Sequence, residues 1–225
     1  MNVFHTSSMH QSSSTFHSFF THLRFIGEGG YKVVFQTQTP KGEEALSVMN
    51  LSLLRRKQLD VVAKQDLYCS LLLSLLVTHQ VLPLYTQLFG AFTTLFPPPI
   101  LSSAPPSDEY LYLRMEYNNC GDLETYLKHG SEINSQLILS FFLQMVLSLY
   151  VANRVYGVVH YDVKLLNFFL TKSPERNLIF QFPWGDYELP SYNGMNWIVK
   201  LGDFGTTEIG IEGNISEIGR ASCRE

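Results

Sequence analysis

A compact polar group interrupts an apolar run near residue 160. Asp162, Lys164 and Asn167 lie at spacings of two and three residues, within an apolar run that includes Val158-Val159 and Leu165-Leu166. A hydrophobic core excludes such a group unless it binds something, because unpaired buried charges cost folding free energy. The run therefore predicts a binding or catalytic site.

Two further motifs carry candidate phosphate-binding and metal-binding groups. Gly27, Gly29 and Gly30 lie between two predicted strands, where bare backbone N–H groups can approach a phosphate closely. Alone, such a loop is most often an ordinary hairpin. The stretch 199–205 is typical of an apolar strand that ends in Asp203 and a flexible glycine. Each motif has an ordinary structural interpretation, but the three in this order favour a common site.

Composition bounds the class of protein. The chain of 225 residues is 45% hydrophobic and 16% charged, which suits one large domain or two small lobes. Its net charge of −4 argues against a nucleic-acid partner. Three cysteines without CxxC spacing indicate neither a disulfide framework nor a zinc site. They favour a reducing compartment, so we expect an intracellular protein, cytoplasmic or nuclear.

Periodicity and turn residues predict a small sheet with one helix, followed by a helical lobe. Three strands are expected within 20–50, and one each at 84–92 and 110–117. Helices are expected at 54–77, at 135–154 and from a start at 121–123, and 96–108 is expected to be a proline-rich loop. The insertion 174–197 is expected to form a hairpin, which either packs on the helical lobe or serves as a surface for a partner.

Two segments bear on targeting. Residues 1–20 are rich in Ser and His and lack the cationic start of a signal peptide, so we expect a flexible extension. The best membrane candidate, 137–159, is interrupted by Gln144, Asn153 and Arg154, and its apolar residues recur near the helical period. We therefore expect a buried helix and no membrane partner; no oligomeric state is predicted.

From about Leu23 to Thr207 the motifs resemble those of the eukaryotic protein kinases. The resemblance implies a bilobal α+β fold, with a complete antiparallel N-lobe sheet (21–117) and part of a helical C-lobe (118–216). It implies that Asp162 is the catalytic base and that Lys164 lies near the transferred phosphoryl group. It also implies that Asn167 and Asp203 hold magnesium. A lysine two residues after the aspartate is the usual Ser/Thr-kinase pattern.

The resemblance also maps the nucleotide site. It implies that the glycine loop covers the phosphates and that Met115 is the gatekeeper. Asp122 would contact the ribose; it is also a candidate helix N-cap, a role that does not exclude the ribose contact. The remaining groups that it places around adenine are backbone of Glu116 and of Tyr117 to Asn118, an apolar roof of Val34 and Ala45, and Phe169 as the floor.

Three positions depart from the family pattern. Ser47 stands where the family has its phosphate-binding lysine, while Lys32 replaces the third glycine of the loop. This arrangement is similar to that of the with-no-lysine kinases, so Lys32 is either the substitute cation or an ordinary exposed strand lysine. Asp66 is the nearest acidic substitute for the missing αC glutamate. Tyr161 replaces the arginine that normally receives an activation-loop phosphate, which argues against activation by that route.

The resemblance implies an ATP- and magnesium-dependent kinase that phosphorylates Ser/Thr hydroxyls of protein substrates. An ATP-binding pseudokinase scaffold and an inactive truncated fragment are the alternatives. Residues 218–225 match the translation of a common sequencing adapter, so we expect residues 217–225 to be an artefact. The biological sequence then ends near Ser216, inside an incomplete kinase domain.

Overall fold

The computed structural model describes residues 21–98, 107–130, 133–173, 178–182, 185–189, 191–192, 195–210 and 221–223. The chain divides into two compact units. The first comprises residues up to 67 together with 88–117, and the second comprises 68–87 and the chain from 118 onward. The expectations for residues 1–20, and most of those for the proline-rich loop and for 211–220, lie outside the described residues.

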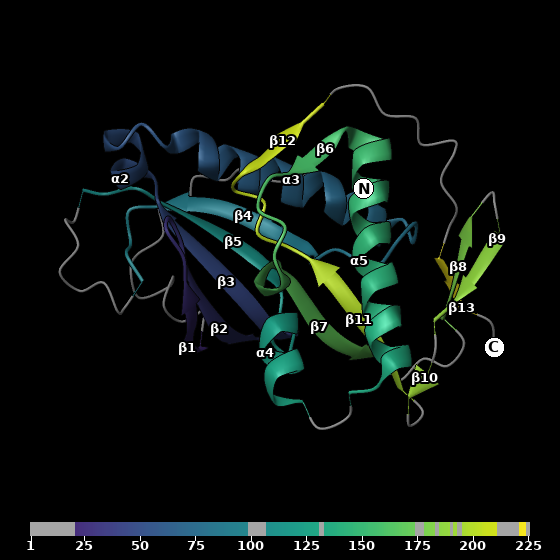
Figure 1. The fold of residues 1–225 in the computed structure, drawn as a ribbon. Coiled ribbons are helices and arrows are strands. Elements are labelled where there is room, and N and C mark those ends of the chain that lie inside the picture. Colours follow the sequence, from purple (N-terminus) through teal and green to yellow (C-terminus); the bar gives the residue numbers. More distant parts are fainter. Residues whose placement is uncertain are drawn as a thin grey trace. The chain divides into compact units, whose positions relative to one another are not determined.

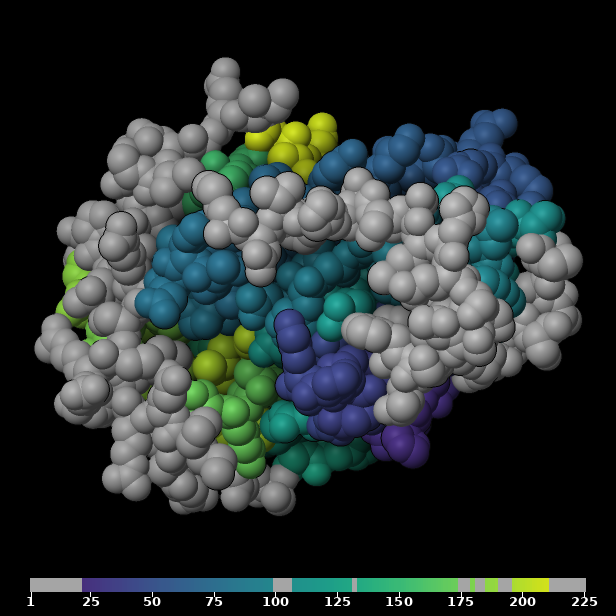
Figure 2. Space-filling view, turned by 180° about the vertical axis from the view of Figure 1, so that it is seen from behind, coloured from purple at the N-terminus to yellow at the C-terminus, as the bar shows by residue number. Residues whose placement is uncertain are grey.

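The first unit is built on a five-stranded antiparallel sheet with the order β1-β2-β3-β5-β4 (Figure 1). Its strands are β1 (Thr21–Glu28), β2 (Val33–Thr39), β3 (Gly42–Asn50), β4 (Leu88–Thr94) and β5 (Tyr110–Glu116). Side chains alternate between faces, and one face forms a core from Phe35, Leu46, Val48, Tyr110 and Tyr112. The purple residues of the first strands reach the molecular surface (Figure 2). Phe25 of β1 is 47% exposed. The predicted N-terminal sheet is confirmed.

Two helices follow β3 where one was predicted over 54–77. Helix α2 (Leu51–Arg56) begins earlier because the Asn50 side chain accepts a hydrogen bond from Leu53 N at 2.8 Å. It ends because Gln58 adopts a left-handed φ of 57°. Helix α3 (Asp60–Thr78) then starts as a separate element.

The strand predicted over 84–92 begins only at Leu88, in β4. The backbone of 84–86 belongs to the second unit instead, where Leu201 N donates to Leu84 O at 2.9 Å and Thr86 N donates to Leu201 O at 3.1 Å. An extended apolar segment pairs with whichever strand edge lies beside it, which periodicity alone does not reveal.

The second unit packs helices on small sheets (Figure 1). Its elements are α4 (Leu123–His129), α5 (Ser135–Tyr156), β6 (Val158–His160), β7 (Phe168–Ser173), β10 (Ser191–Tyr192), β11 (Met195–Leu201) and β12 (Thr207–Ile209). The sheets are β10-β11-β7 and β12-β6. Helix α5 confirms the predicted long helix, and it ends at Gly157, whose φ of 61° suits a glycine.

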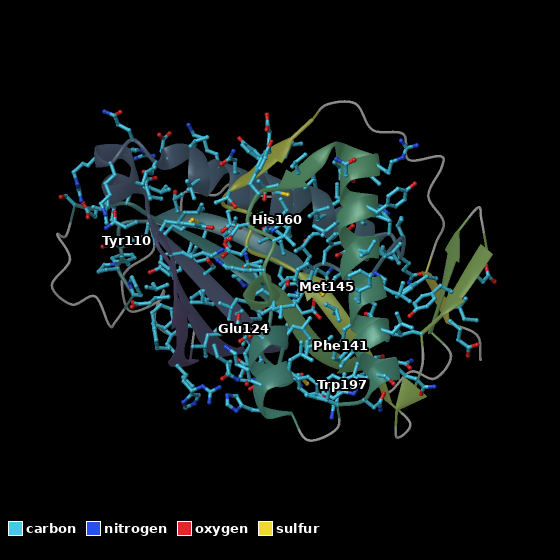
Figure 3. The ribbon with its side chains drawn as sticks, in the orientation of Figure 1. Tyr110, Glu124, Phe141, Met145, His160 and Trp197 are labelled. Carbon is cyan, nitrogen blue, oxygen red and sulfur yellow. The ribbon has the colours of Figure 1, made fainter. Side chains whose placement is uncertain are left out.

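Aromatic side chains join α5 to β11. Phe141 and Trp197 lie together in Figure 3, with ring centroids 6.3 Å apart in a T-shaped arrangement. Tyr126 of α4 approaches the Trp197 ring to 4.7 Å. These rings bury a large apolar area and prefer edge-to-face contacts, so they anchor the helices on the sheet.

The predicted hairpin within 174–197 is confirmed as β8 (Leu178–Phe182) paired antiparallel with β9 (Gly185–Glu188). Phe180 is buried in the main core of the second unit and stacks on Tyr187 at 6.0 Å, which supports the packing interpretation of this insertion. Strand β13 (Ala221–Cys223) pairs with the other edge of β8. Residues 224–225 lie outside the described part of the chain.

Two helices, Asp60–Thr78 and Ser135–Tyr156, are long and apolar enough to cross a membrane by length and composition alone. In each, 39% of the most apolar window is buried inside the protein. Core helices of soluble proteins pass the same test, so this finding leaves the expectation of no membrane partner as a prediction.

Candidate active site

The ends of two paired strands bring Asn167 and Asp203 together in the second unit. Leu201, the last residue of β11, pairs with Phe168, the first residue of β7. One residue outside this pair, Gly202 N donates to Asn167 O at 3.0 Å. Because Asp203 follows directly, the sheet register places both predicted metal-binding residues at the same edge.

Asp162 lies in a network with the two other polar residues of its motif. Lys164 Nζ is 2.6 Å from Asp162 Oδ2. Asn167 Nδ2 donates to Asp162 O at 2.9 Å and to Oδ2 at 3.2 Å. Asn167 is buried, whereas the Asp162 and Lys164 side chains are 39% and 47% exposed. A buried amide thus orients a carboxylate that solvent and substrates can reach.

The charges of this network reinforce one another. The hydrogen bond from Lys164 and that from Asn167 hold the pKa of Asp162 below its usual value, although Asp203 and desolvation oppose the shift. The same pair raises the pKa of Lys164. The carboxylate is therefore ionised near neutral pH and can accept a hydrogen bond from a substrate hydroxyl.

The donor atoms here suit magnesium. Asn167 uses its Nδ2 toward Asp162, so Oδ1 is its ligand-type atom, and Asp203 supplies a carboxylate. Mg²⁺ prefers oxygen ligands and is commonly bound by one or two side chains plus substrate phosphates. Within the described residues, no three His, Cys, Asp or Glu side chains gather into a metal site. The pair therefore fits a metal that arrives with phosphate ligands, not a metal held by the protein alone.

Close packing fixes the residue before Asp203. A Cβ on Gly202 would lie 2.9 Å from the Phe169 ring and 3.2 Å from Thr86 Oγ1. Asp203 itself has a φ of 63°, which is unusual for a residue with a side chain. Phe204 is fully buried and contacts the ring of His160, which Figure 3 labels, at 5.7 Å. The strained backbone of Asp203 is held from both sides.

Asp122 acts as a helix cap. Its Oδ1 accepts from Thr125 N and its Oδ2 from Thr125 Oγ1, both at 2.8 Å. Phe169 pairs with Asp122 across an isolated bridge, so these two predicted nucleotide contacts are neighbours in the second unit. Asn118 donates from Nδ2 to Thr86 Oγ1 at 3.2 Å. The capping interpretation of Asp122 is confirmed, and a ribose contact stays a prediction.

In the first unit, Lys32 forms a salt bridge with Asp66. Lys32 Nζ lies 2.7 Å from Asp66 Oδ2, and the two side chains are 13% and 1% exposed. The interpretation of Lys32 as an ordinary exposed strand lysine is therefore wrong. A buried carboxylate without a cation would be strongly unfavourable, so each side chain depends on the other.

Ser47 lies in β3, within the same sheet as the strand that follows Lys32. The register places it opposite Val34, two residues beyond Lys32. Its side chain is buried, and Oγ has no hydrogen-bond partner among the described residues. The position where the family has lysine thus holds a small, unpaired hydroxyl.

The other predicted nucleotide contacts of the first unit fall on the expected elements. Val34 and Ala45 lie on the sheet face opposite to the core of Phe35 and Leu46, by strict alternation. Glu116 ends β5. Gly27, Gly29 and Gly30 have open space where a Cβ would be, and Gly29 N donates to Lys32 O at 2.8 Å. The loop between β1 and β2 is a tight turn.

Comparison with known proteins identifies the family. The model of the protein kinase domain matches residues 20–216. The chain therefore belongs to the protein kinase family, and its α+β fold with a five-stranded antiparallel sheet is that of a kinase domain.

One curated protein is similar to part of this chain. The chain is 29% identical over 117 residues to a probable serine/threonine-protein kinase of Dictyostelium discoideum. The match covers 50% of this chain and 10% of the relative, so the matched segment spans about a tenth of the length of that protein.

Three residues that contact the site were not predicted from the sequence. Thr86 accepts a hydrogen bond from Asn118, Gly202 packs against Phe169, and Glu208 accepts a hydrogen bond from Tyr161. Each contact joins residues more than 30 positions apart. A single sequence carries no signal for such pairs; only substitutions that co-vary across relatives could have revealed them.

Proposed function

We propose that this chain comes from an ATP- and magnesium-dependent protein kinase that phosphorylates serine and threonine hydroxyls. The observation that carries the proposal is the network of Asp162, Lys164 and Asn167, with Asp203 at the adjoining strand end. Phosphoryl transfer needs positioning and charge neutralisation more than covalent chemistry, and this network supplies both.

The proposed step uses Asp162 to orient the acceptor. The hydroxyl oxygen of the substrate forms a bond to the γ-phosphorus, the bond from that phosphorus to the β,γ-bridging oxygen breaks, and the hydroxyl proton passes to Asp162. Lys164 neutralises charge beside this carboxylate, and Asn167 fixes its direction. Asn167 and Asp203 would hold Mg²⁺, which when bound neutralises phosphate charge.

We propose that Lys32 supplies the cation that Ser47 lacks. Its contact with buried Asp66 supports this role, because the carboxylate holds the ammonium group in one place. The glycine turn that precedes it supplies backbone N–H groups of the kind that bind phosphate. Val34, Ala45, Glu116, Asn118, Asp122 and Phe169 are proposed as the nucleotide contacts.

A phosphotransfer assay of the longest form of the protein that its gene encodes tests both ideas. Asp162→Asn should abolish transfer, and Lys32→Met should lower kcat by about 10²-fold or more, the cost of losing one aimed electrostatic group. Lys41→Met, which removes an exposed lysine in the turn after β2, is the matched control. Full activity in Lys32→Met would refute the substitution, while recovery on adding Ser47→Lys would support it.

The alternative is a nucleotide-binding pseudokinase scaffold, favoured by the neutral Ser47 and by Tyr161. Such a protein would show ATP-dependent thermal stabilisation without turnover, because a ligand that binds only the native state raises stability by mass action. Magnesium-dependent turnover that Asp162→Asn abolishes would exclude this alternative. An intracellular location and the absence of nucleic-acid and membrane partners remain predictions.

A further inference from the structure

The segment after Asp203 returns to the strand that leads into Asp162. Strand β12 pairs antiparallel with β6, with Thr207 opposite His160 and Ile209 opposite Val158. This ladder contains only three residue pairs. Two-stranded ladders this short have little stability of their own in water. Further contacts must therefore hold β12 against β6.

His160, the last residue of β6, and Tyr161, which follows it, form hydrogen bonds with residues on both sides of Asp203 in the sequence. Before it, the carbonyl of Gly202 accepts from His160 Nε2 at 3.1 Å. After it, the hydroxyl of Tyr161 donates to Glu208 Oε2 at 2.7 Å. The residue that follows Tyr161 along the chain is Asp162. Two neighbouring side chains therefore tie the segment that carries Asp203 to the start of the catalytic loop.

Backbone hydrogen bonds close both ends of the ladder. Gly210 N donates to Gly157 O at 3.1 Å beyond Ile209, and Thr207 N donates to Phe204 O at 3.1 Å in the turn before β12. These bonds use backbone atoms and do not depend on side-chain identity. The bond from Tyr161 to Glu208 is different, because single substitutions can remove it without disturbing the backbone.

We propose that Tyr161 is a positioning residue: its hydrogen bond to Glu208 latches β12 onto β6 and so holds Asp203 in place for the metal-bound nucleotide. This inference rests on the proposed function. The latch consists of two side chains of this chain, so it needs no phosphate group to close. The Tyr161 side chain is 66% exposed, so the latch is open to competition by water and contributes a modest, measurable factor.

The pKa of Tyr161 agrees with this geometry. The hydrogen bond to the Glu208 carboxylate, with the charge of that carboxylate, raises the pKa of the phenol above its usual value. The phenol therefore keeps its proton and remains a donor throughout the range in which the protein would work.

The test uses Tyr161→Phe, which removes one oxygen and keeps the ring, in the longest form that the gene encodes. One net hydrogen bond corresponds to a factor of about two to ten. We expect the Mg²⁺ concentration that half-saturates the ATP-induced thermal shift to rise by about that factor. Amide exchange at 207–209 should accelerate by a similar factor. Tyr68→Phe, which alters an exposed tyrosine of α3, is the matched control.

Variants of Glu208 separate positioning from general stability. Glu208→Gln retains an acceptor oxygen and should restore behaviour near wild type, whereas Glu208→Leu should match Tyr161→Phe. Combining Tyr161→Phe with Glu208→Leu should add nothing to either change alone. Faster amide exchange with an unchanged Mg²⁺ requirement would overturn the proposal, because Tyr161 would then be merely structural.

The latch and the reaction can fail separately. If wild type transfers phosphate and Tyr161→Phe behaves like Tyr68→Phe, the latch is overturned and the proposed function stands. If wild type binds magnesium and nucleotide in a Tyr161-dependent manner without transferring phosphate, the reaction fails and the latch stands. If wild type shows no magnesium-dependent nucleotide binding, the positioning role is overturned as well.

Discussion

Gln144 completes the edge of strand β11, and replacing it should destabilise the second unit strongly. The side chain is fully buried in α5. Its Nε2 donates to Trp197 O at 3.0 Å, and its Oε1 accepts from Val199 N at 2.9 Å. In the described part of the chain, β10 pairs only with residues 195–196 of β11. The amide of Gln144 thus takes the place of a neighbouring strand for the carbonyl of Trp197 and the N–H of Val199.

The magnitude follows from the two backbone groups that lose their partners. Gln144→Met keeps the side-chain volume close to that of the original but supplies neither donor nor acceptor. A buried backbone group without a partner costs about 1–3 kcal/mol, so we expect the free energy of unfolding to fall by about 2–6 kcal/mol. The free energy of unfolding of single domains is about 5–15 kcal/mol in total, so this substitution removes a large part of the stability.

Urea unfolding followed by tryptophan fluorescence measures this loss, because Trp197 lies beside the substituted residue and is only 5% exposed. Gln136→Met on the exposed face of the same helix is the matched control and should change stability by less than about 0.5 kcal/mol. Gln144→Glu should behave in a pH-dependent manner. Burial raises the pKa of the introduced carboxyl, so its protonated form, which can both donate and accept, gives stability below its unfolded pKa that is lost as the pH rises.

For the case in which Gln144→Met leaves too little folded protein to titrate, Gln144→Glu at acidic and neutral pH provides the comparison. A Gln144→Met protein that unfolds at the same urea concentration as Gln136→Met would refute the reasoning. So would a Gln144→Glu protein whose stability does not depend on pH beyond that of wild type.

Two other expectations concern the active site. Gly202→Ala places a methyl group 2.9 Å from the Phe169 ring, and we expect a loss of about 1–3 kcal/mol in thermal unfolding; Gly90→Ala, where no atom lies within 4 Å, is the control. Equal losses in the two variants would contradict the packing argument. Lys164→Met removes the main cause of the lowered pKa of Asp162, so carbon-13 NMR of that carboxyl should show its pKa rising. Because a lowered carboxyl pKa stabilises the native state above the unfolded pKa, the variant should lose part of that pH dependence; an unchanged titration would exclude Lys164 as its cause.

Features that depend on neighbours along the chain were predictable from the sequence. Helix α5 begins after Asn134, whose side chain caps Leu137 N at 2.9 Å, and ends at Gly157. The three strands of 21–50 follow from alternating apolar residues and from the turn at Gly42. Asp162, Lys164 and Asn167 were predicted as one polar group because the chain itself places them within six residues.

Features that depend on tertiary pairing were not predictable. The break at Gln58 uses a left-handed backbone at a residue that helices usually accept. The segment 84–86 is apolar enough to continue β4, and its bonds to Leu201 decide otherwise. In both cases the local preference is weak, and the surrounding structure determines the conformation.

The phosphate-binding cation shows how local and tertiary information combine. From sequence, Lys32 and Asp66 were separate candidates, one in a glycine loop and the other in a helix of uncertain register. The ion pair at 2.7 Å joins them and leaves Ser47, the usual lysine position, with a hydroxyl that binds no described group. A lysine at position 47 would bury a second ammonium group, because Ser47 is buried and lies opposite Val34, two residues beyond Lys32. A buried cation without a partner of its own is strongly unfavourable. The small residue at 47 and the lysine at 32 are therefore parts of one arrangement, which is why the Lys32→Met, Ser47→Lys exchange is the informative double variant.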